Sequence, residues 1–382
     1  MKKIMMIAGE PSGDLHGSNL ILALKNLSPD IDVFGTGGER MRAAGARLVF
    51  DLRDLAVTGL FDVIKNLARL IKIQRTLLSE ISAERPDLLI LIDYPDFNLR
   101  FAKKAKALGV PIVYYIGPQV WAWRKGRIRL LKKYIDKMIV IFRFEEDLYK
   151  KEGMPVEFFG HPLLDIVKPS LTRAEFLKVP QPRGEWPSPE NRIVALMPGS
   201  RKGLVKRHLP IMLEAAALIY QRFPESYFLI SKSPALNVAI YRQAIESLDL
   251  PVTVVENDTY NVLNAADFVI TISGTITLET AIMGKPMAII YRLPWLEYLI
   301  ARPLLRLKNI GLANIVAGKE IAPEFIQSRA RADLIAADVI DLLEDPKRYE
   351  VMKEALARAA TSLLPAGAAK GAAASIIRWL QR

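Results

Sequence analysis

Three segments of the chain combine a strand-like apolar run with a glycine-containing turn that opens a helix. The turns are Gly9–Asp14, Pro198–Arg201 and Ser273–Thr275, and each follows directly on its apolar run. Glycine lets a backbone approach a ligand closely, and the free N–H groups of a helix start favour a phosphate. In an open α/β sheet such turns lie at the carboxyl ends of the strands, where ligands bind. No turn matches a complete nucleotide-binding motif, but their recurrence in both halves predicts two nucleotide-type domains facing one cleft.

The polar residues of these turns are the candidates for substrate binding. A guanidinium at Arg201 can hold a diphosphate through two hydrogen bonds, and Glu279 can accept hydrogen bonds from ribose hydroxyls. Two simpler interpretations stay open, namely a surface arginine and a helix capped by Ser or Thr with an early acidic residue. The candidates are Glu10, Ser12, Gly13, Ser200, Arg201, Ser273, Gly274, Thr275, Thr277 and Glu279.

Two carboxylates and an amide follow another apolar run, Leu88–Ile92, which is typical of a buried parallel strand. Asp93, Asp96 and Asn98 would therefore lie at a carboxyl edge. One carboxylate can act as a general base there, although either can instead cap the next helix. A lone histidine, His161, stands near the middle of the chain and is more often structural at such a position.

The amino-acid composition limits the classes of metal site and binding partner that can be expected. The chain has 382 residues, no cysteine and three scattered histidines, so a thiolate or histidine-rich metal site is not expected. The net charge of +12 and pI of 9.6 indicate an anionic partner. A hydrophobic fraction of 51% with mean hydropathy +0.16 favours an anionic lipid surface over nucleic acid, for which no motif is present.

Two amphipathic segments support that preference. Leu60–Leu78 sets leucines and isoleucines opposite lysines and arginines at helical spacing, and Trp295–Lys308 combines aromatic, leucine and basic residues. An ordinary helix with one buried face has the same pattern. Tyr114–Arg124 holds two tryptophans beside a basic turn, which suits sugar stacking, a lipid interface or plain core packing. No run approaches the ~20 apolar residues of a spanning helix, so a cytoplasmic or peripheral protein is expected.

The order of elements predicts an α/β fold with two doubly wound parallel sheets. The expected domains are residues 1–168, a proline-rich linker at 169–192, a second domain at 193–345, and C-terminal helices at 346–382 that can cross back to the first domain or swap in a dimer. The predicted strands are Ile4–Ala8, Asp32–Gly35, Leu88–Ile92, Ile112–Ile116, Lys137–Ile141, Val156–Phe159, Ile193–Met197, Tyr227–Ile230, Thr253–Val255, Phe268–Ile272 and Met287–Tyr291.

Eight strings, read in order along nearly the whole chain, resemble the lipid-A-disaccharide synthase family of glycosyltransferases. They are AGEPSGD, TGLFDV, DYPDFN, QVWAWR, GHPLLD, MPGSR, SGTITLE and IGLANIVAG. The resemblance implies a GT-B fold, with the active site between two Rossmann-like domains. It also implies transfer of a sugar from UDP-diacylglucosamine to diacylglucosamine 1-phosphate, giving a β(1→6) disaccharide with inversion. It implies no metal or other cofactor, peripheral attachment to the inner face of the inner membrane, and a homodimer in which C-terminal helices can swap.

Residue by residue, the resemblance gives Asp96 the role of catalytic carboxylate and Arg201 that of a functional arginine. Ser273, Gly274, Thr275 and Glu279 match the nucleotide-side loop, and Asn314 matches the asparagine of the last string. Two strings depart from the family pattern, with Gly-Pro-Gln at 117–119 instead of Ser-Pro-Ser and Leu-Ala-Asn at 312–314 instead of Leu-Pro-Asn. Asp93, Glu10 and His16 remain alternative bases. A UDP-sugar epimerase, a nucleic-acid binder and a non-catalytic nucleotide sensor remain alternative functions.

Overall fold

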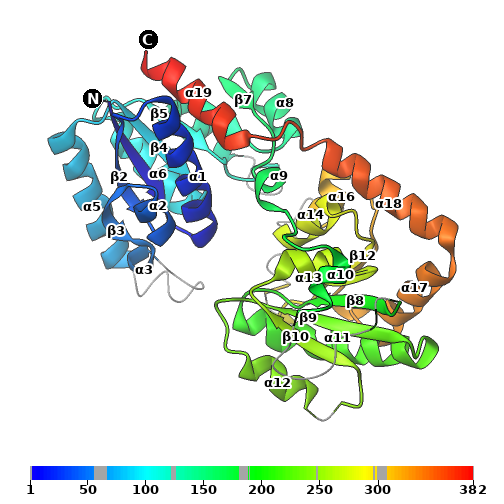
Figure 1. Ribbon diagram of the computed structural model, residues 1–382. Helices are drawn as coiled ribbons and strands as arrows, with labels where there is room; N and C mark the ends of the chain where they lie inside the picture. Colours follow the sequence, from blue (N-terminus) through cyan, green and yellow to red (C-terminus); the bar gives the residue numbers. More distant parts are fainter. Residues whose placement is uncertain are drawn as a thin grey trace. The chain divides into compact units, whose positions relative to one another are not determined.

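The computed structural model describes residues 2–55, 67–121, 126–179, 188, 190–246, 248–295, 297–298 and 308–381 (Figure 1). The chain divides into two compact units. The first unit comprises Met1–Asp165 and Leu363–Arg382, and the second comprises Ile166–Ser362. The expected linker lies within the second unit, and the C-terminal segment 346–382 is divided between the two units at residue 363.

The first unit contains a seven-stranded sheet in the order β3-β2-β1-β4-β5-β6-β7, with every neighbouring pair parallel. Its strands are β1 (Lys3–Ala8), β2 (Asp32–Gly37), β3 (Arg47–Asp51), β4 (Leu88–Ile92), β5 (Ile112–Tyr115), β6 (Lys137–Val140) and β7 (Val156–Phe158). Its helices are α1 (Pro11–Leu27), α2 (Glu39–Ala43), α3 (Leu52–Leu55), α5 (Leu67–Glu84), α6 (Pro95–Lys106), α7 (Arg127–Tyr134), α8 (Arg143–Lys151) and α19 (Ala368–Leu380). Helix α9 (Leu163–Ile166) lies at the boundary.

The first unit has two apolar clusters, one on each face of its sheet, and the side chains of β1 alternate between them. Met5 joins one apolar cluster and Ile4 joins the other, because successive side chains of a strand point to opposite faces. Both faces of the sheet are therefore buried under helices, as parallel sheets require. The C-terminal helix α19 adds Ala373 to the cluster that contains Ile4. It is also tied to the sheet by Lys137, whose Nζ donates to Ser375 Oγ at 2.6 Å.

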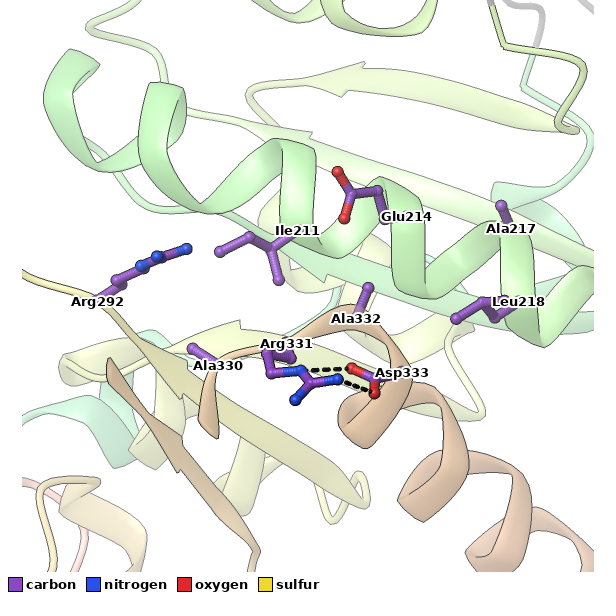
Figure 2. A pocket seen from close by; sticks show the side chains of 9 residues that line it. All are labelled: Ile211, Glu214, Ala217, Leu218, Arg292, Ala330, Arg331, Ala332 and Asp333. Atoms are coloured by element: carbon purple, nitrogen blue, oxygen red, sulfur yellow. Dashed lines mark hydrogen bonds and ion pairs between the residues drawn. The ribbon is translucent and has the colours of Figure 1, made fainter. Parts of the chain in front are cut away.

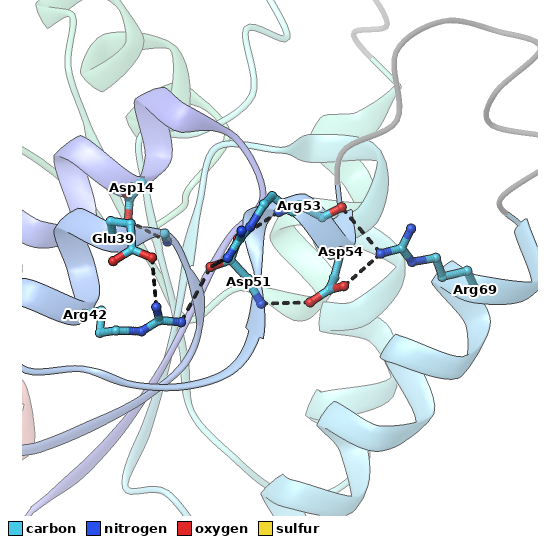
Figure 3. Close-up of polar contacts among 8 residues, drawn as sticks. Asp14, Glu39, Arg42, Asp51, Arg53, Asp54 and Arg69 are labelled. Carbon is cyan, nitrogen blue, oxygen red and sulfur yellow. Dashed lines mark hydrogen bonds and ion pairs between the residues drawn. The ribbon is translucent and has the colours of Figure 1, made fainter. Parts of the chain in front are cut away.

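Ion pairs connect the elements around β3 (Figure 3). Arg42 of α2 pairs with Glu39 at 2.8 Å and with Asp51 at 3.5 Å. Arg69 of α5 pairs with Asp54 of α3 at 2.8 Å, so α3 and α5 are held together. Because the side chains of the Arg42–Glu39 and Arg69–Asp54 pairs are largely exposed, each of these two pairs contributes only about 0–1 kcal/mol.

The second unit contains a six-stranded parallel sheet in the order β10-β9-β8-β11-β12-β13. Its strands are β8 (Arg192–Met197), β9 (Ser226–Lys232), β10 (Val252–Glu256), β11 (Phe268–Ile272), β12 (Met287–Tyr291) and β13 (Glu324–Ile326). Its helices are α10 (Arg173–Phe176), α11 (Lys202–Arg222), α12 (Ala239–Ile245), α13 (Thr259–Ala265), α14 (Thr275–Ile282), α16 (Leu312–Ala317), α17 (Ala332–Glu344) and α18 (Pro346–Thr361). Phe176 of α10, inside the expected linker, is buried in this unit's core.

The structure confirms all the predicted strands and adds two, β3 and β13. Both added strands lie at a sheet edge, where one side is unpaired and the apolar pattern is weak. β3 has no fully buried residue, and β13 has only three residues. Edge position alone does not hide a strand, since the edge strands β7 and β10 were predicted.

The predicted amphipathic segments are only partly described. Leu60, Val63 and Ile64 lie outside the described residues, as do Leu296, 299–307 and 122–125. Within α5, Leu77 is fully buried in the core, whereas Ile71 is 41% exposed. The described part of the apolar face therefore packs mainly inward, as in an ordinary buried-face helix. Within the described residues, no helix is long and apolar enough to cross a membrane.

Candidate functional site

The first candidate edge lies where strand order reverses in the first unit, between β1 and β4. Ala8 is paired with Ile92, so the turns that follow these two strands are neighbours. The contact is close: a Cβ on Gly9 would lie 2.3 Å from the ring of Tyr94. Only glycine fits there, and the two turns form one packed surface at the point where ligands bind in open α/β sheets.

Asp93 begins the second of these turns in a strained conformation. Asp93 and Tyr94 have φ of 44° and 49°, in the left-handed region that non-glycine residues avoid. The carbonyl oxygen of Asp93 accepts hydrogen bonds from Asn98 Nδ2 and from Tyr114 Oη, each at 2.7 Å. Burial, and next the charge of Glu10, raise the pKa of Asp93 to about 6. Asp93 is thus poised for proton transfer near neutral pH. Asn98 Nδ2 is bonded within the turn, whereas its Oδ1 is buried without a hydrogen-bond partner among the described residues.

Asp96 occupies the first turn of α6 and has a different environment. Its side chain is 64% exposed and forms an ion pair with Arg127 of α7, which is only 11% exposed. Tyr94 is the N-cap residue of α6, and no side chain caps this helix. The capping alternative for Asp93 and Asp96 is therefore not observed, and both carboxylates remain candidates for chemistry.

The turn after β1 supplies fewer free groups than expected. Glu10 and Ser12 are exposed at the start of α1, but Gly13 is buried, and a Cβ there would lie 3.3 Å from Cβ of Ala8. Gly13 therefore permits helix–strand packing. Burial lowers the pKa of His16 to about 4, and its Nδ1 has no hydrogen-bond partner among the described residues. A neutral imidazole of this kind can accept a hydrogen bond.

His161 is structural, as a lone histidine at such a position usually is. Its Nδ1 accepts the N–H of Leu163 at 3.1 Å, and its ring lies 5.1 Å from that of Phe142. Burial, and then the charge of His16, lower the pKa of His161 to about 3. The imidazole is therefore neutral across the physiological range and is committed to local packing.

The second candidate edge lies where strand order reverses in the second unit, between β8 and β11. Gly199 has φ 103°, and a Cβ there would lie 2.5 Å from Ile272 Cδ1. Gly274 has φ 152°, with no atom within 4 Å of a Cβ. Arg201 is the exposed N-cap residue of α11. Neighbouring strand ends thus present open backbone and a guanidinium, a combination that suits a diphosphate.

The hydroxyls of this edge divide into used and available groups. Ser273 Oγ donates to the carbonyl of Ile310 at 2.8 Å, and the buried Thr277 Oγ1 donates to that of Gly274 at 2.8 Å. Thr275 and Ser200 are exposed. Gly274 is the N-cap residue of α14 without any side-chain cap, so the proposed Ser or Thr cap is absent. The glycine at the helix start leaves the backbone uncovered.

Glu279 lies one turn into α14 and is half-buried. Burial raises its pKa to about 7, although the hydroxyl of Tyr260, which donates to Oε1 at 3.4 Å, opposes the change. A half-buried carboxylate with few hydrogen-bond donors is stabilised by further donors, such as the hydroxyls of a ribose.

Asn314, a predicted substrate-binding residue, has its polar atoms bonded inside the unit. Nδ2 donates to Ala322 O at 2.7 Å and to Glu324 Oε1 at 2.8 Å. Oδ1 accepts the N–H groups of Ile321 and Ala322 at 2.8 and 2.9 Å. These bonds support a role in shaping the loop rather than in touching a ligand. Sequence reasoning missed Glu324 because it missed β13.

A cavity of about 520 Å³ lies elsewhere in the second unit, beside α11 and the start of α17 (Figure 2). It is lined by Ile211, Glu214, Ala217, Leu218, Arg292, Ala330, Arg331, Ala332 and Asp333. No residue of either candidate edge lines it. Among the described residues there is also no group of three or more acidic, histidine or cysteine side chains that could hold a metal ion.

Comparison with known proteins shows the family to which the chain belongs. The family model described as Lipid-A-disaccharide synthetase matches residues 4–374, which is nearly the whole chain. The chain belongs to this family. It is 43% identical to the lipid-A-disaccharide synthase of Geobacter metallireducens over 99% of this chain and 97% of that one. It is 42% identical to that of Syntrophus aciditrophicus over 100% and 98%. The chain is accordingly a glycosyltransferase of the hexosyltransferase type.

Solved structures confirm the predicted GT-B fold. The Staphylococcus aureus MnaA–UDP structure aligns with TM-score 0.67 and 15% identity over 100% of this chain and 97% of that one. The calicheamicin glycosyltransferase CalG4 aligns with TM-score 0.61 and 16% identity over 100% and 99%. The UDP-GlcNAc 2-epimerase of Neisseria meningitidis, bound to UDP-GlcNAc, gives TM-score 0.64 and 14% identity over 99% and 100%. At these identities the likeness concerns the fold alone.

Proposed function

We propose that the protein condenses UDP-2,3-diacylglucosamine with 2,3-diacylglucosamine 1-phosphate, giving a β(1→6) lipid A disaccharide 1-phosphate and UDP. The observation that carries this proposal is where the family strings fall in the fold. Those that contain Glu10, Asp96, Arg201 and Ser273 follow the strands at the switch point of each sheet, where ligands bind in open α/β folds.

The chemistry divides between two kinds of group. In the second unit, Arg201 and the open backbone at Gly274 hold the donor's diphosphate. As the bond between the sugar carbon and the diphosphate oxygen breaks, its electron pair passes to UDP. The fixed cation and N–H groups stabilise that developing charge.

In the first unit, Asp96 accepts the proton of the acceptor's 6-hydroxyl while that oxygen attacks the sugar carbon. One displacement with one base inverts the configuration and forms no covalent intermediate. The ion pair with Arg127 of α7 holds the exposed Asp96 side chain at the start of α6. Asp93, Glu10 and His16 are the alternatives, and the environment of Asp93 makes it the foremost of them.

The protein works at an anionic membrane surface, on the cytoplasmic face of the inner membrane. Both substrates carry acyl chains, and the net charge of +12 favours association with anionic lipid. Ile71 and Trp295, at 41% and 68% exposed, are apolar groups available to such a surface. A homodimer accords with the family. Sedimentation with vesicles of anionic and of neutral lipid tests the surface, and light scattering tests the dimer.

The deciding experiment is a transfer assay with labelled UDP-diacylglucosamine, the lipid acceptor and excess chelator, read by mass spectrometry. We expect one disaccharide 1-phosphate and one UDP for each turnover. Conversion of the UDP-sugar to an isomer without the acceptor would instead establish an epimerase, a reaction named for several proteins of the same fold. Binding of UDP without either product would make the protein a nucleotide sensor.

A further inference from the structure

A buried carboxylate lies behind the nucleotide-side edge of the second unit. Glu324 of β13 is only 8% exposed. Its carboxylate accepts the N–H of Ile310 and that of Gly311, each at 2.9 Å, and the Nδ2 of Asn314 at 2.8 Å. No cation lies within ion-pair distance of it among the described residues. The charge is therefore stabilised by N–H donors, and a buried charge of this kind is costly unless each bond is made.

These bonds lead directly to the nucleotide-side turn. The N–H of Ile310 donates to Glu324, and the carbonyl oxygen of Ile310 accepts the hydroxyl of Ser273 at 2.8 Å. One peptide segment is thus held by the carboxylate on one side and by the turn on the other. The packing allows little slack, because a Cβ on Gly311 would lie 2.5 Å from Ile289 Cδ1 and 3.2 Å from Glu324 Oε1.

We infer that Glu324 is a positioning residue for sugar-nucleotide binding: with Asn314 it fixes Ile310, and through Ile310 it holds the Ser273–Gly274 turn open to the donor's diphosphate. This inference rests on the proposed function, since it assigns that turn to UDP. Asn314, which the family strings single out, then acts through the same assembly rather than by touching the ligand.

The assembly depends on the carboxylate having only acceptor atoms. A glutamine at position 324 has the same shape, but its NH₂ group would face the N–H of Ile310 or the amide of Asn314, and a donor–donor contact would replace a bond. An aspartate at position 314 would give that NH₂ group an acceptor, at the cost of the bond that Asn314 Nδ2 donates to Ala322 O at 2.7 Å. The double change, with glutamine at position 324 and aspartate at position 314, therefore restores the hydrogen bond between these two side chains that Glu324→Gln alone removes.

The experiment measures UDP affinity by calorimetry in the full-length protein, with circular dichroism as the check on folding. We expect Glu324→Gln to raise the Kd for UDP about tenfold or more, and Ser273→Ala to act in the same direction. The double variant Glu324→Gln/Asn314→Asp should recover part of the loss in binding free energy relative to the Glu324→Gln variant, since the bond to Ala322 O is not replaced. Kinetically, KM for the UDP-sugar should rise more than kcat falls.

Asn261→Asp is the matched control. Asn261, of α13 in the same unit, is also buried; its Oδ1 accepts the N–H groups of Ser170 and Leu171 at 3.0 Å, and its Nδ2 donates to Ser170 Oγ at 2.8 Å. The bonds of Asn261 go to Ser170 and Leu171, and none of them involves Ile310 or the Ser273–Gly274 turn. We expect it to lower the Tm while leaving the Kd for UDP within twofold.

The possible results distinguish a failure of the positioning role from a failure of the proposed function. Unchanged affinity in folded Glu324→Gln, or an equal loss in Asn261→Asp, overturns the positioning role. If Glu324→Gln does not fold, Glu324→Asp takes its place, because it keeps the charge and withdraws the carboxylate by one carbon; wild-type affinity in that variant would overturn the inference equally. Absence of UDP binding in the wild-type protein would overturn the proposed function instead.

Discussion

The carboxyl edges of the two sheets have the same topology but present different chemistry. In the first unit the switch point carries side-chain acids, with Asp93 strained and partly buried and Asp96 exposed beside Arg127. In the second unit it carries backbone and a cation, with Gly274 open and Arg201 exposed. Proton transfer needs a carboxyl group with a tuned environment, whereas a diphosphate needs N–H donors and positive charge. One scaffold thus serves two tasks through the residues of its turns.

The largest effect is expected at the acidic edge. Asp96→Asn should lower kcat by about 10²–10⁴-fold, the usual worth of a general base, while the Kd for UDP stays near that of the wild type. Steady-state transfer rates and calorimetry together test this. The matched variant is Asp93→Asn, which changes a neighbouring carboxylate on the same turn.

If Asp93→Asn loses the activity and Asp96→Asn keeps it, the roles are reversed. The pH profile then gives a second criterion. With Asp93 as the base, its raised pKa of about 6 predicts that kcat/KM falls as the pH drops below about 6. This fall should disappear only in variants at position 93.

A somewhat smaller effect is expected at the cationic edge. Arg201→Ala should lower kcat by about 10²–10³-fold, comparable with the loss of one fixed donor to a developing oxyanion. Arg201→Lys should recover only part of the rate, because an ammonium cannot form two parallel bonds to a diphosphate. Lys202→Ala, the same charge removed one residue later, should stay close to wild type. Equal losses at positions 201 and 202 would reduce the role of Arg201 to general positive charge.

Gly274→Ala tests whether the open backbone of the second edge matters. At φ 152° an added side chain costs about 1–3 kcal/mol of stability, and the methyl group would occupy the space in which a ligand approaches. We expect UDP affinity to fall about tenfold. Gly284→Ala is the control, since that glycine also has positive φ, 65°, with nothing within 4 Å of a Cβ. Similar destabilisation with unchanged affinity at position 284 would support ligand contact at 274.

The smallest effect concerns Glu279. Burial raises its pKa to about 7 in the folded protein, above its usual 4.5, so the folded state binds the proton more tightly than the unfolded chain does. Its contribution to stability is therefore fully present below about pH 4.5 and is lost as the pH rises through 7. Each pH unit between the two pKa values is worth at most about 1.4 kcal/mol. In Glu279→Gln this slope should vanish in Tm measurements from pH 4.5 to 8, and an unchanged slope would assign it to other groups.

Much of the fold could be predicted from particular runs of residues. Leu88–Ile92 and Phe268–Ile272 are the strands that their unbroken apolar patterns predict, with the same first and last residues. The turns after these strands could also be predicted, because they are marked by residues that directly follow each apolar run. The strands β3 and β13 could not: β3 has no fully buried residue, and β13 has only three residues, one of them a glutamate. Because β13 was not predicted, Glu324 was not recognised as a buried residue, nor as the partner of Asn314.

By itself the sequence determined the α/β class, the position of the three glycine turns and the family, because these depend on residues that are neighbours along the chain. Only the tertiary structure decided which polar groups are already bonded and how each acid titrates. Asn314 looks like a ligand residue in the sequence, yet both polar atoms of its amide are bonded within the fold. Arg127 reaches Asp96 across a separation of 31 residues. Burial and partners of this kind arise from distant segments brought together, and no local pattern records them.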